Sequence, residues 1–337
     1  MNNIAVNIFA KILELTPNKI REQYFDNIVP IFMLHRIDDK FQISSYSYSH
    51  HITECLEYIR KYKYNPISLQ EYITSVANGE KIKPKSVIFT VDDGFYDQYD
   101  IGGTLFGNYD IPLTCFVISD FIDGVLWPWD DQLIYILSNT KLKYLDIKLP
   151  NQSRYSINLN ESEESVYKSM RHLRNLLKGM NQSDIYAWIE NLYTALDVEQ
   201  LTEAPFDFRP MSWNDAQKFI DNGHHIAPHT KTHRILSQLS DKEAYHEITE
   251  SVTRVKKMLN GSSDVFAYPT GRTIDYGERE ISLLKKLDIH CAVNTVPGHI
   301  HKKTDLYNLP RFTLPRTKFN FIQYLTFFEE LKHRILS

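Results

Sequence analysis

The stretch that decides the fold is Ser86–Gly94, which reads SVIFTVDDG. The consecutive apolar or β-branched residues Val87–Val91 are typical of a short strand that is buried on both faces. Two adjacent carboxylates, Asp92 and Asp93, follow where the strand is expected to end. Neighbouring residues of a strand point to opposite faces, so one acid can bind a metal while the other accepts a proton. Asp-Asp-Gly is also a favoured turn sequence, and a simple turn is the alternative interpretation.

The composition is that of an ordinary globular protein. The chain has 337 residues, of which 42% are hydrophobic and 24% are charged, so it can form one large α/β domain or two ordinary ones. A net charge of −4 indicates no nucleic acid partner and no strong attraction to an anionic membrane. The three cysteines, Cys55, Cys115 and Cys291, lie far apart without a CxxC pair, which suits a reducing compartment.

The N-terminal residues have helical periodicity, because Ile4, Ile8, Ile12 and Leu15 recur at helical spacing. The segment lacks the basic start and the small-residue cleavage site of a signal peptide, and no apolar run in the chain reaches transmembrane length. We therefore expect residues 1–27 to contain a helix that docks on the body of the protein, and a cytoplasmic location. Peripheral attachment to a membrane is the alternative for this helix.

Short apolar segments alternate with amphipathic helical segments in two parts of the chain, residues 28–120 and 209–318. This alternation predicts a parallel, barrel-like α/β fold, and we call these two parts the α/β body. Residues 121–208 differ, because they are charged and helical with one possible hairpin at 144–159. We interpret them as an insertion that caps one end of the body. Residues 319–337 are predicted to form a C-terminal helix.

The segment His229–His233, which reads HTKTH, follows an expected strand at residues 224–228. Histidines at i and i+4 share one side of a helical turn, so both imidazoles can reach one ion. Such a pair arises easily by chance among 13 histidines. Its position carries more weight, because it lies, like Asp92 and Asp93, at the C-terminal end of a strand, where parallel barrels place catalysis. One carboxylate with two imidazoles suits Zn²⁺, and Co²⁺, Ni²⁺ or Fe²⁺ can occupy the same site.

Three motifs resemble those of the polysaccharide deacetylases, which are carbohydrate esterase family 4 and carry the NodB homology domain. Thr90–Gly94, TVDDG, resembles that family's TFDDG, and His229–His233 resembles its H-[ST]-x-x-H. Phe266–Gly271, FAYPTG, lies where the third motif, FRPPYG, belongs. The resemblance covers about residues 28–120 and 209–315, and it implies a distorted (β/α)7 barrel with a mainly helical insertion.

The resemblance also implies residue roles. Asp93, His229 and His233 would bind a divalent metal, expected to be Zn²⁺, and Asp92 would act as the general base. The backbone N–H near Thr270 would stabilise the oxyanion, although threonine stands here where the family has tyrosine. The implied reaction is hydrolysis of an acetamide on an N-acetylated sugar.

The sequence departs from the family pattern at two functional positions, so other residues must take over these two roles. The arginine of the third motif is Ala267 here, so we expect Arg311 to orient Asp92; a surface arginine beside a turn is the alternative. The family's late L-x-H histidine matches only residues 331–333, which we interpret as chance. We therefore predict that His35, at the end of the first strand, is the general acid, with a simple strand-end histidine as the alternative.

The sequence thus favours a metal-dependent hydrolase that removes acetyl groups from an N-acetylhexosamine unit of a glycan or glycolipid. Two alternatives remain. One is an amidohydrolase acting on a C–N bond outside a sugar. The other is an inactive carbohydrate-binding relative, for which the missing third-motif arginine is the main support.

Overall fold

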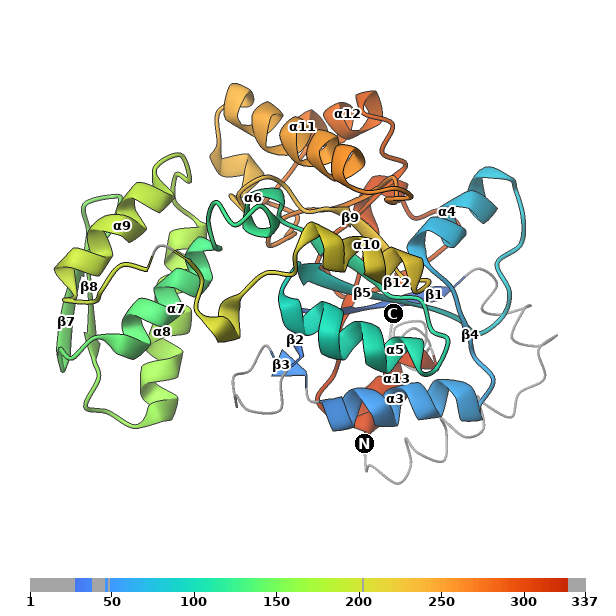
Figure 1. Ribbon diagram of the computed structural model, residues 1–337, viewed down its shortest axis with the longest axis horizontal. Helices are drawn as coiled ribbons and strands as arrows, with labels where there is room; N and C mark the ends of the chain where they lie inside the picture. The colour runs from blue at the N-terminus through green and yellow to red at the C-terminus, as the bar shows by residue number, and fades with distance from the viewer. Residues whose placement is uncertain (1–27, 38–45, 48, 202, 327–337) are drawn as a thin grey trace, which may run out of the picture.

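A computed structural model describes residues 28–37, 46–47, 49–201 and 203–326 (Figure 1). The helix predicted within residues 1–27 and the triplet at 331–333 lie outside the described residues. The C-terminal helix predicted from residue 319 is described only in part, as α13 (Lys318–Leu325).

The centre of the molecule is a mainly parallel sheet in which the strands follow the order β12-β1-β5-β6-β9. The strand that carries the two aspartates, β5 (Ser86–Asp93), lies in its middle and is buried along its whole length. Its neighbours β1 (Val29–Leu34) and β6 (Thr114–Val117) run parallel to it, and β9 (His225–Pro228) runs parallel to β6. The α/β class predicted from the sequence is therefore confirmed.

Shorter strands pair with β1 and β5 and complete the sheet. β12 (His299–Ile300) pairs antiparallel with β1, which makes the sheet mixed at that edge. β13 (Phe312–Thr313) pairs parallel with β1, and β4 (Asn65–Pro66) pairs parallel with β5. β10 (Val265–Ala267) and β11 (Cys291–Val293) form a separate parallel pair that packs beside β9. Among the described strands, the hydrogen bonds therefore do not close a continuous barrel.

The side chains nevertheless meet as they would inside a barrel. Alternate residues of β1 and β5, such as Ile31 and Ile88, join Phe116, Ala227 and Val293 in one buried cluster. The intervening residues of the same strands pack outward against helices in a second cluster. Because Asp92 has the same parity as Ile88, the pleat directs it toward the interior.

Helices cover the outside of the sheet, with α11 and α12 along one edge and α3 and α13 along the opposite edge (Figure 1). Two helix starts are capped by serine side chains: Ser68 accepts a hydrogen bond from Glu71 N, and Ser212 forms a capping box with Asp215. The helices of the α/β body are α3 (Ser49–Lys61), α4 (Leu69–Ala77), a π-helical turn at Gln98–Gly103, α5 (Thr104–Gly107), α10 (Trp213–Asp221), α11 (Asp241–Met258) and α12 (Glu278–Lys286).

The insertion forms a lobe at one side of the body (Figure 1, green). It contains α7 (Trp129–Asn139), α8 (Glu163–Lys178), α9 (Ile185–Ala195) and the predicted hairpin, seen as antiparallel β7 (Tyr144–Lys148) and β8 (Arg154–Asn158). The short helix α6 (Ser119–Ile122) leads into the lobe, which buries apolar side chains of its own. None of the helices in the described ranges combines the length and apolar character that crossing a bilayer requires.

Candidate metal centre

One cavity of about 690 Å³ opens where β1, β5 and β9 end. The predicted site residues that line it are His35, Asp92, Asp93, His229, His233 and Thr270. Arg311, the seventh, is fully buried behind Asp92. Residues separated by more than 200 positions in the sequence therefore meet at one place, at the carboxyl ends of parallel strands.

Three of these residues form a compact set of metal-ligand atoms. Asp93, His229 and His233 are buried, and one potential ligand atom of each lies within 4.8 Å of the other two. Asp93 Oδ1 is 3.7 Å from His229 Nε2 and 3.6 Å from His233 Nε2. Ligand atoms that bind one tetrahedral ion at about 2.0–2.2 Å lie about 3.3–3.6 Å apart, so the spacing fits a zinc-like ion.

The hydrogen bonds around the triad also fit a metal. His229 Nδ1 lies 2.8 Å from the Ala267 carbonyl, to which its N–H donates, and this leaves Nε2 free for an ion. Among the described residues His233 Nδ1 makes no hydrogen bond, but it lies 3.7 Å from a carboxylate oxygen of Asp130, and its Nε2 is directed at Asp93. Asp93 Oδ1 is buried without a hydrogen-bond partner in the described structure. A buried carboxylate oxygen without a partner is costly unless a cation satisfies it.

The local conformation of HTKTH differs from the prediction. Residues 229–233 lie in a loop after β9, not on a helical turn, so the i, i+4 argument was wrong about how the two histidines meet. Thr230 and His233 have left-handed φ values of 65° and 57°, and these reverse the chain so that the rings lie 5.0 Å apart. Backbone strain of this kind persists only where surrounding contacts enforce it.

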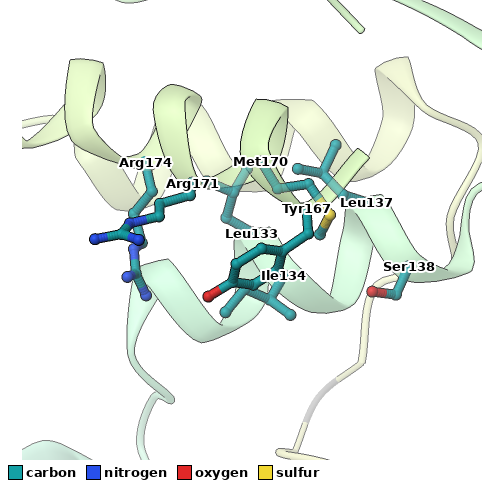
Figure 2. A pocket seen from close by; sticks show the side chains of 8 residues that line it. All are labelled: Leu133, Ile134, Leu137, Ser138, Tyr167, Met170, Arg171 and Arg174. Carbon is teal, nitrogen blue, oxygen red and sulfur yellow. The ribbon is translucent and has the colours of Figure 1, made fainter. Parts of the chain in front are cut away.

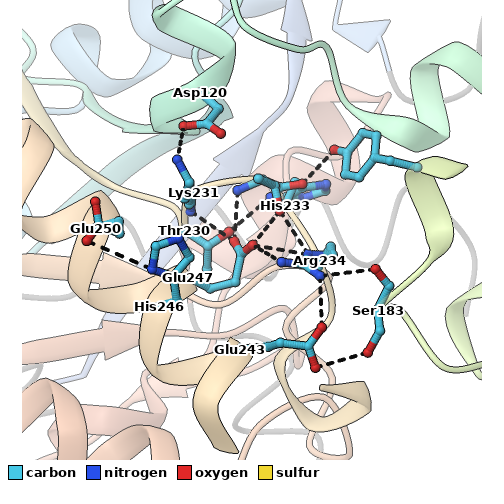
Figure 3. A network of polar contacts seen from close by, with 12 residues as sticks. Asp120, Ser183, Thr230, Lys231, His233, Arg234, Glu243, His246, Glu247 and Glu250 are labelled. Carbon is cyan, nitrogen blue, oxygen red and sulfur yellow. Dashed lines mark hydrogen bonds and ion pairs between the residues drawn. The ribbon is translucent and has the colours of Figure 1, made fainter. Parts of the chain in front are cut away.

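Those contacts come from Glu247 of α11, which is fully buried beneath the loop (Figure 3). Its carboxylate accepts hydrogen bonds from the backbone N–H groups of Lys231 and Thr232 at 3.1 and 2.8 Å. Arg234 donates to the same carboxylate from Nε and Nη2 at 3.1 and 2.9 Å. The insertion reaches this loop as well, because Tyr186 of α9 donates its hydroxyl to the Thr232 carbonyl at 2.6 Å.

Asp92 forms a bidentate ion pair with Arg311. Both Nη atoms of the arginine lie 2.7 Å from the two carboxylate oxygens, and Arg311 Nε donates to the Asn294 carbonyl at 2.8 Å. Burial opposes ionisation of Asp92, but the Arg311 charge and its hydrogen bonds outweigh it and hold the Asp92 pKa at about 2. The carboxylate is therefore charged and fixed in direction at neutral pH, and Arg311 lies where the sequence argument expected it.

Gln98, which is fully buried in the π-helical turn, forms hydrogen bonds to the chain at the ends of both β1 and β5. Its amide nitrogen donates to the His35 and Asp92 carbonyls, and its oxygen accepts from Gly94 N at 3.0 Å. Gly94 has a φ of +92°, and a side chain there would press on Val117. This arrangement fixes the backbone of both strands at the mouth of the cavity.

The remaining predicted residues lie in the cavity wall. His35 follows β1 and shares the lining with both aspartates. Thr270 has a φ of +56°, and its backbone N–H has no protein acceptor among the hydrogen bonds of the described residues. A backbone N–H without an acceptor, on a residue of the cavity wall, is a candidate donor for an oxyanion.

Burial and charge act differently on the two histidines. Burial lowers the pKa of His229 to about 4, although Asp92 and Asp93 oppose this, so the imidazole is neutral and can bind an ion. Burial also disfavours the charged form of His233, but Asp130 and Asp93 raise its pKa overall. A metal on Nε2 would replace the proton that these carboxylates attract.

Sequence reasoning missed Asp130, Gln98 and Glu247, and also three basic side chains of α8 that line the cavity: Arg171, Arg174 and Lys178. The pattern around Asp130, WPWDD, is equally typical of the first turn of a helix, where acidic residues are common. The spacing of Arg171, Arg174 and Lys178 on one helical face was a usable signal.

Comparison with known proteins finds one matching family model and several similar folds. Residues 172–292 match the family model described as polysaccharide deacetylase, and no curated protein matches the chain by sequence. The fold is similar to that of Streptococcus pyogenes deacetylase PplD in complex with acetate, at 16% identity and a TM-score of 0.58, with 87% of this chain and 94% of that chain covered.

Two further solved structures have the same fold. A de-N-acetylase from Aggregatibacter actinomycetemcomitans is 12% identical with a TM-score of 0.57, and the match covers 89% of this chain and 100% of that one. IcaB from Ammonifex degensii is 12% identical with a TM-score of 0.56, with 89% and 97% covered. The family match and these folds confirm the resemblance found in the sequence, which is to the polysaccharide deacetylases.

Proposed function

We propose that this protein is a metal-dependent hydrolase that removes acetyl groups from N-acetylated sugars. The observation that carries the proposal is the triad of Asp93, His229 and His233 beside a charged, oriented Asp92 in one cavity. The family match supports deacetylation as the class of reaction. The domain boundaries, the residue roles, the choice of Zn²⁺ and the cytoplasmic location remain predictions from the sequence.

A divalent metal on the triad would polarise the amide carbonyl and make water a better nucleophile. Asp92 accepts the proton of the attacking water, while Arg311 holds the carboxylate in place. The backbone N–H of Thr270 donates to the oxygen that gains negative charge. His35 gives a proton to the nitrogen that leaves, because an unprotonated amide nitrogen is a poor leaving group.

Release of acetate tests this proposal. Purified protein loaded with Zn²⁺ is incubated with N-acetylglucosamine oligomers, and acetate is quantified before and after removal of metal with a chelator. We expect acetate release that stops on chelation and returns when Zn²⁺ is added back. Release that continues at the same rate in metal-free protein would contradict the metal-dependent proposal, and hydrolysis of only non-sugar amides would favour the amidohydrolase alternative.

A further inference from the structure

The wall of the cavity that faces the proposed metal centre is basic. Arg171, Arg174 and Lys178 come from α8 of the insertion, and Arg316 comes from the segment after β13. On α8 these positions are i, i+3 and i+7, so the three side chains share one helical face. The insertion thus contributes a row of cations to a cavity whose proposed chemistry lies on the α/β body.

Among the residues that the structure describes, these cations form no direct ion pairs, although Asp130 lies near enough to attract Arg174 and Lys178. Within the described residues, none of the four side chains forms a hydrogen bond, and Arg174 Nε is buried without a partner. The lining contains four basic side chains and the carboxylates of Asp92, Asp93 and Asp130. Arg311 already balances Asp92, Asp93 is a proposed metal ligand, and Asp130 offsets only part of the charge of Arg174 and Lys178. Positive charge therefore remains in excess on this wall and favours an anionic ligand.

Lys178 is surrounded by charges of both signs. Burial lowers its pKa, Asp130 opposes this, and the nearby charges of Arg174 and Arg272 lower it further. An anion bound beside Lys178 would favour the charged form of this lysine and so oppose both the burial and the neighbouring positive charges. Guanidinium groups match the oxygen geometry of phosphate, so a phosphate group is the ligand that two arginines and a lysine suit best.

The same arginines also border an apolar groove between α7 and α8. This groove has a volume of about 160 Å³, and Leu133, Ile134, Tyr167 and Met170 are among the residues that line it. Figure 2 shows Arg171 and Arg174 together at one end of the groove, with the apolar side chains extending away from them. The cavity, the arginines and the groove are therefore contiguous.

We propose that the substrate is an amphiphile in which an N-acetyl sugar is joined through phosphate to a hydrocarbon chain. The sugar lies at the metal centre, the phosphate on Arg171, Arg174 and Lys178, and the first part of the chain in the groove between α7 and α8. This assignment rests on the proposed deacetylase function and names the substrate class of the same site.

Four forms of N-acetylglucosamine test the assignment: the free sugar, its 1-phosphate, its octyl glycoside and its 1-(octyl phosphate). The kcat/KM for acetate release is measured on each with Zn²⁺-loaded protein. We expect at least a tenfold gain from the phosphate and a further gain of several-fold when the octyl chain is attached through it, as charge-assisted hydrogen bonds and burial of methylenes predict. Equal efficiency on all four overturns the assignment, and a gain from phosphate with none from the chain overturns its lipid part.

Variants with matched controls locate each contribution. Arg174→Ala is expected to remove most of the gain due to phosphate, whereas Lys168→Ala, which removes an exposed cation of the same helix paired with Glu164, retains it. Ile134→Asn is expected to remove the gain due to the chain, whereas Leu142→Asn, at an exposed apolar position outside the groove, retains it. Loss of the gains in the controls as well would contradict the placement.

Binding separates this inference from the proposed function. Octyl phosphate, which has no acetyl group, is titrated calorimetrically into the native protein and into Arg174→Ala. If no acetate is released from any sugar, the proposed function fails. Octyl phosphate that binds the native protein at least tenfold more tightly than the variant still supports the anionic site, and equal affinity overturns it.

Discussion

The α/β body and the insertion differ in how far their charged side chains are paired at the cavity they share. In the body, Asp92 is matched to Arg311 by two hydrogen bonds, and the loop of His229 and His233 is held by Glu247. In the insertion, Arg171 and Arg174 face the cavity with no ion-pair partner among the described residues.

This difference indicates that the body carries out the chemistry and that the insertion selects the substrate. Groups that carry out chemistry must be held in position before the substrate arrives, and buried paired charges achieve this. Groups that select a substrate can leave their charge unmatched, because the substrate itself supplies the counter-ion. Changes in the body should therefore abolish turnover on every substrate, whereas changes in the insertion, apart from Asp130 beside His233, should alter preference or stability.

The largest effect is expected from the metal ligands. His229→Ala or His233→Ala should lower bound metal by at least about an order of magnitude, because three protein ligands leave little redundancy. Metal content after dialysis and acetate release measure the effect, and His246→Ala, which removes an exposed histidine of α11, is the control. Full metal occupancy in both ligand variants would contradict the proposed metal site.

The next effect is expected from the proposed base. Asp92→Asn should retain the metal and lose about 10²–10⁴-fold in kcat, the usual contribution of a positioned general base. Asp146→Asn, at an exposed carboxylate of the insertion hairpin, should be unchanged. If Asp92→Asn lost the metal while Asp93→Asn kept it, the roles of the two acids would be exchanged.

The two aspartates show what the sequence could and could not supply. Their place at a strand end, and the approach of Arg311 to Asp92, followed from the alternation of elements and from the gap left by Ala267. The left-handed φ values of Asp93, Thr230, His233 and Thr270 could not be predicted from the sequence, because residues other than glycine adopt such values in only a few per cent of cases. The roles of Gln98 and Glu247 could not be predicted, because each side chain bonds to backbone groups of other elements that only the folded chain brings near.

A smaller and more selective effect is expected from His35. His35→Ala should bind metal normally and lose most turnover on amide substrates. It should lose much less on an activated aryl acetate, whose leaving group needs no proton. The ratio of the two kcat values is the measurement, and equal losses on both substrates would count against the role of general acid.

The smallest effect is expected where the insertion touches the metal-binding loop. Tyr186→Phe removes one hydrogen bond to the Thr232 carbonyl and should cost about 0.5–1.5 kcal/mol of unfolding free energy. Denaturant unfolding measures this, and metal content should not change. Loss of metal in this variant would show that α9, in addition to Asp130 of α7, helps to build the metal centre. Assigning metal binding to the α/β body would then be wrong.

The most direct test of the account is the position of the metal itself. Crystals of the Zn²⁺-loaded protein, measured at the zinc absorption edge, give anomalous density that places the ion without assumptions. If Asp93, His229 and His233 bind the metal, we expect one strong peak about 2.0–2.2 Å from Asp93 Oδ1, His229 Nε2 and His233 Nε2. A peak elsewhere, or ligation by Asp92 in place of Asp93, would contradict it.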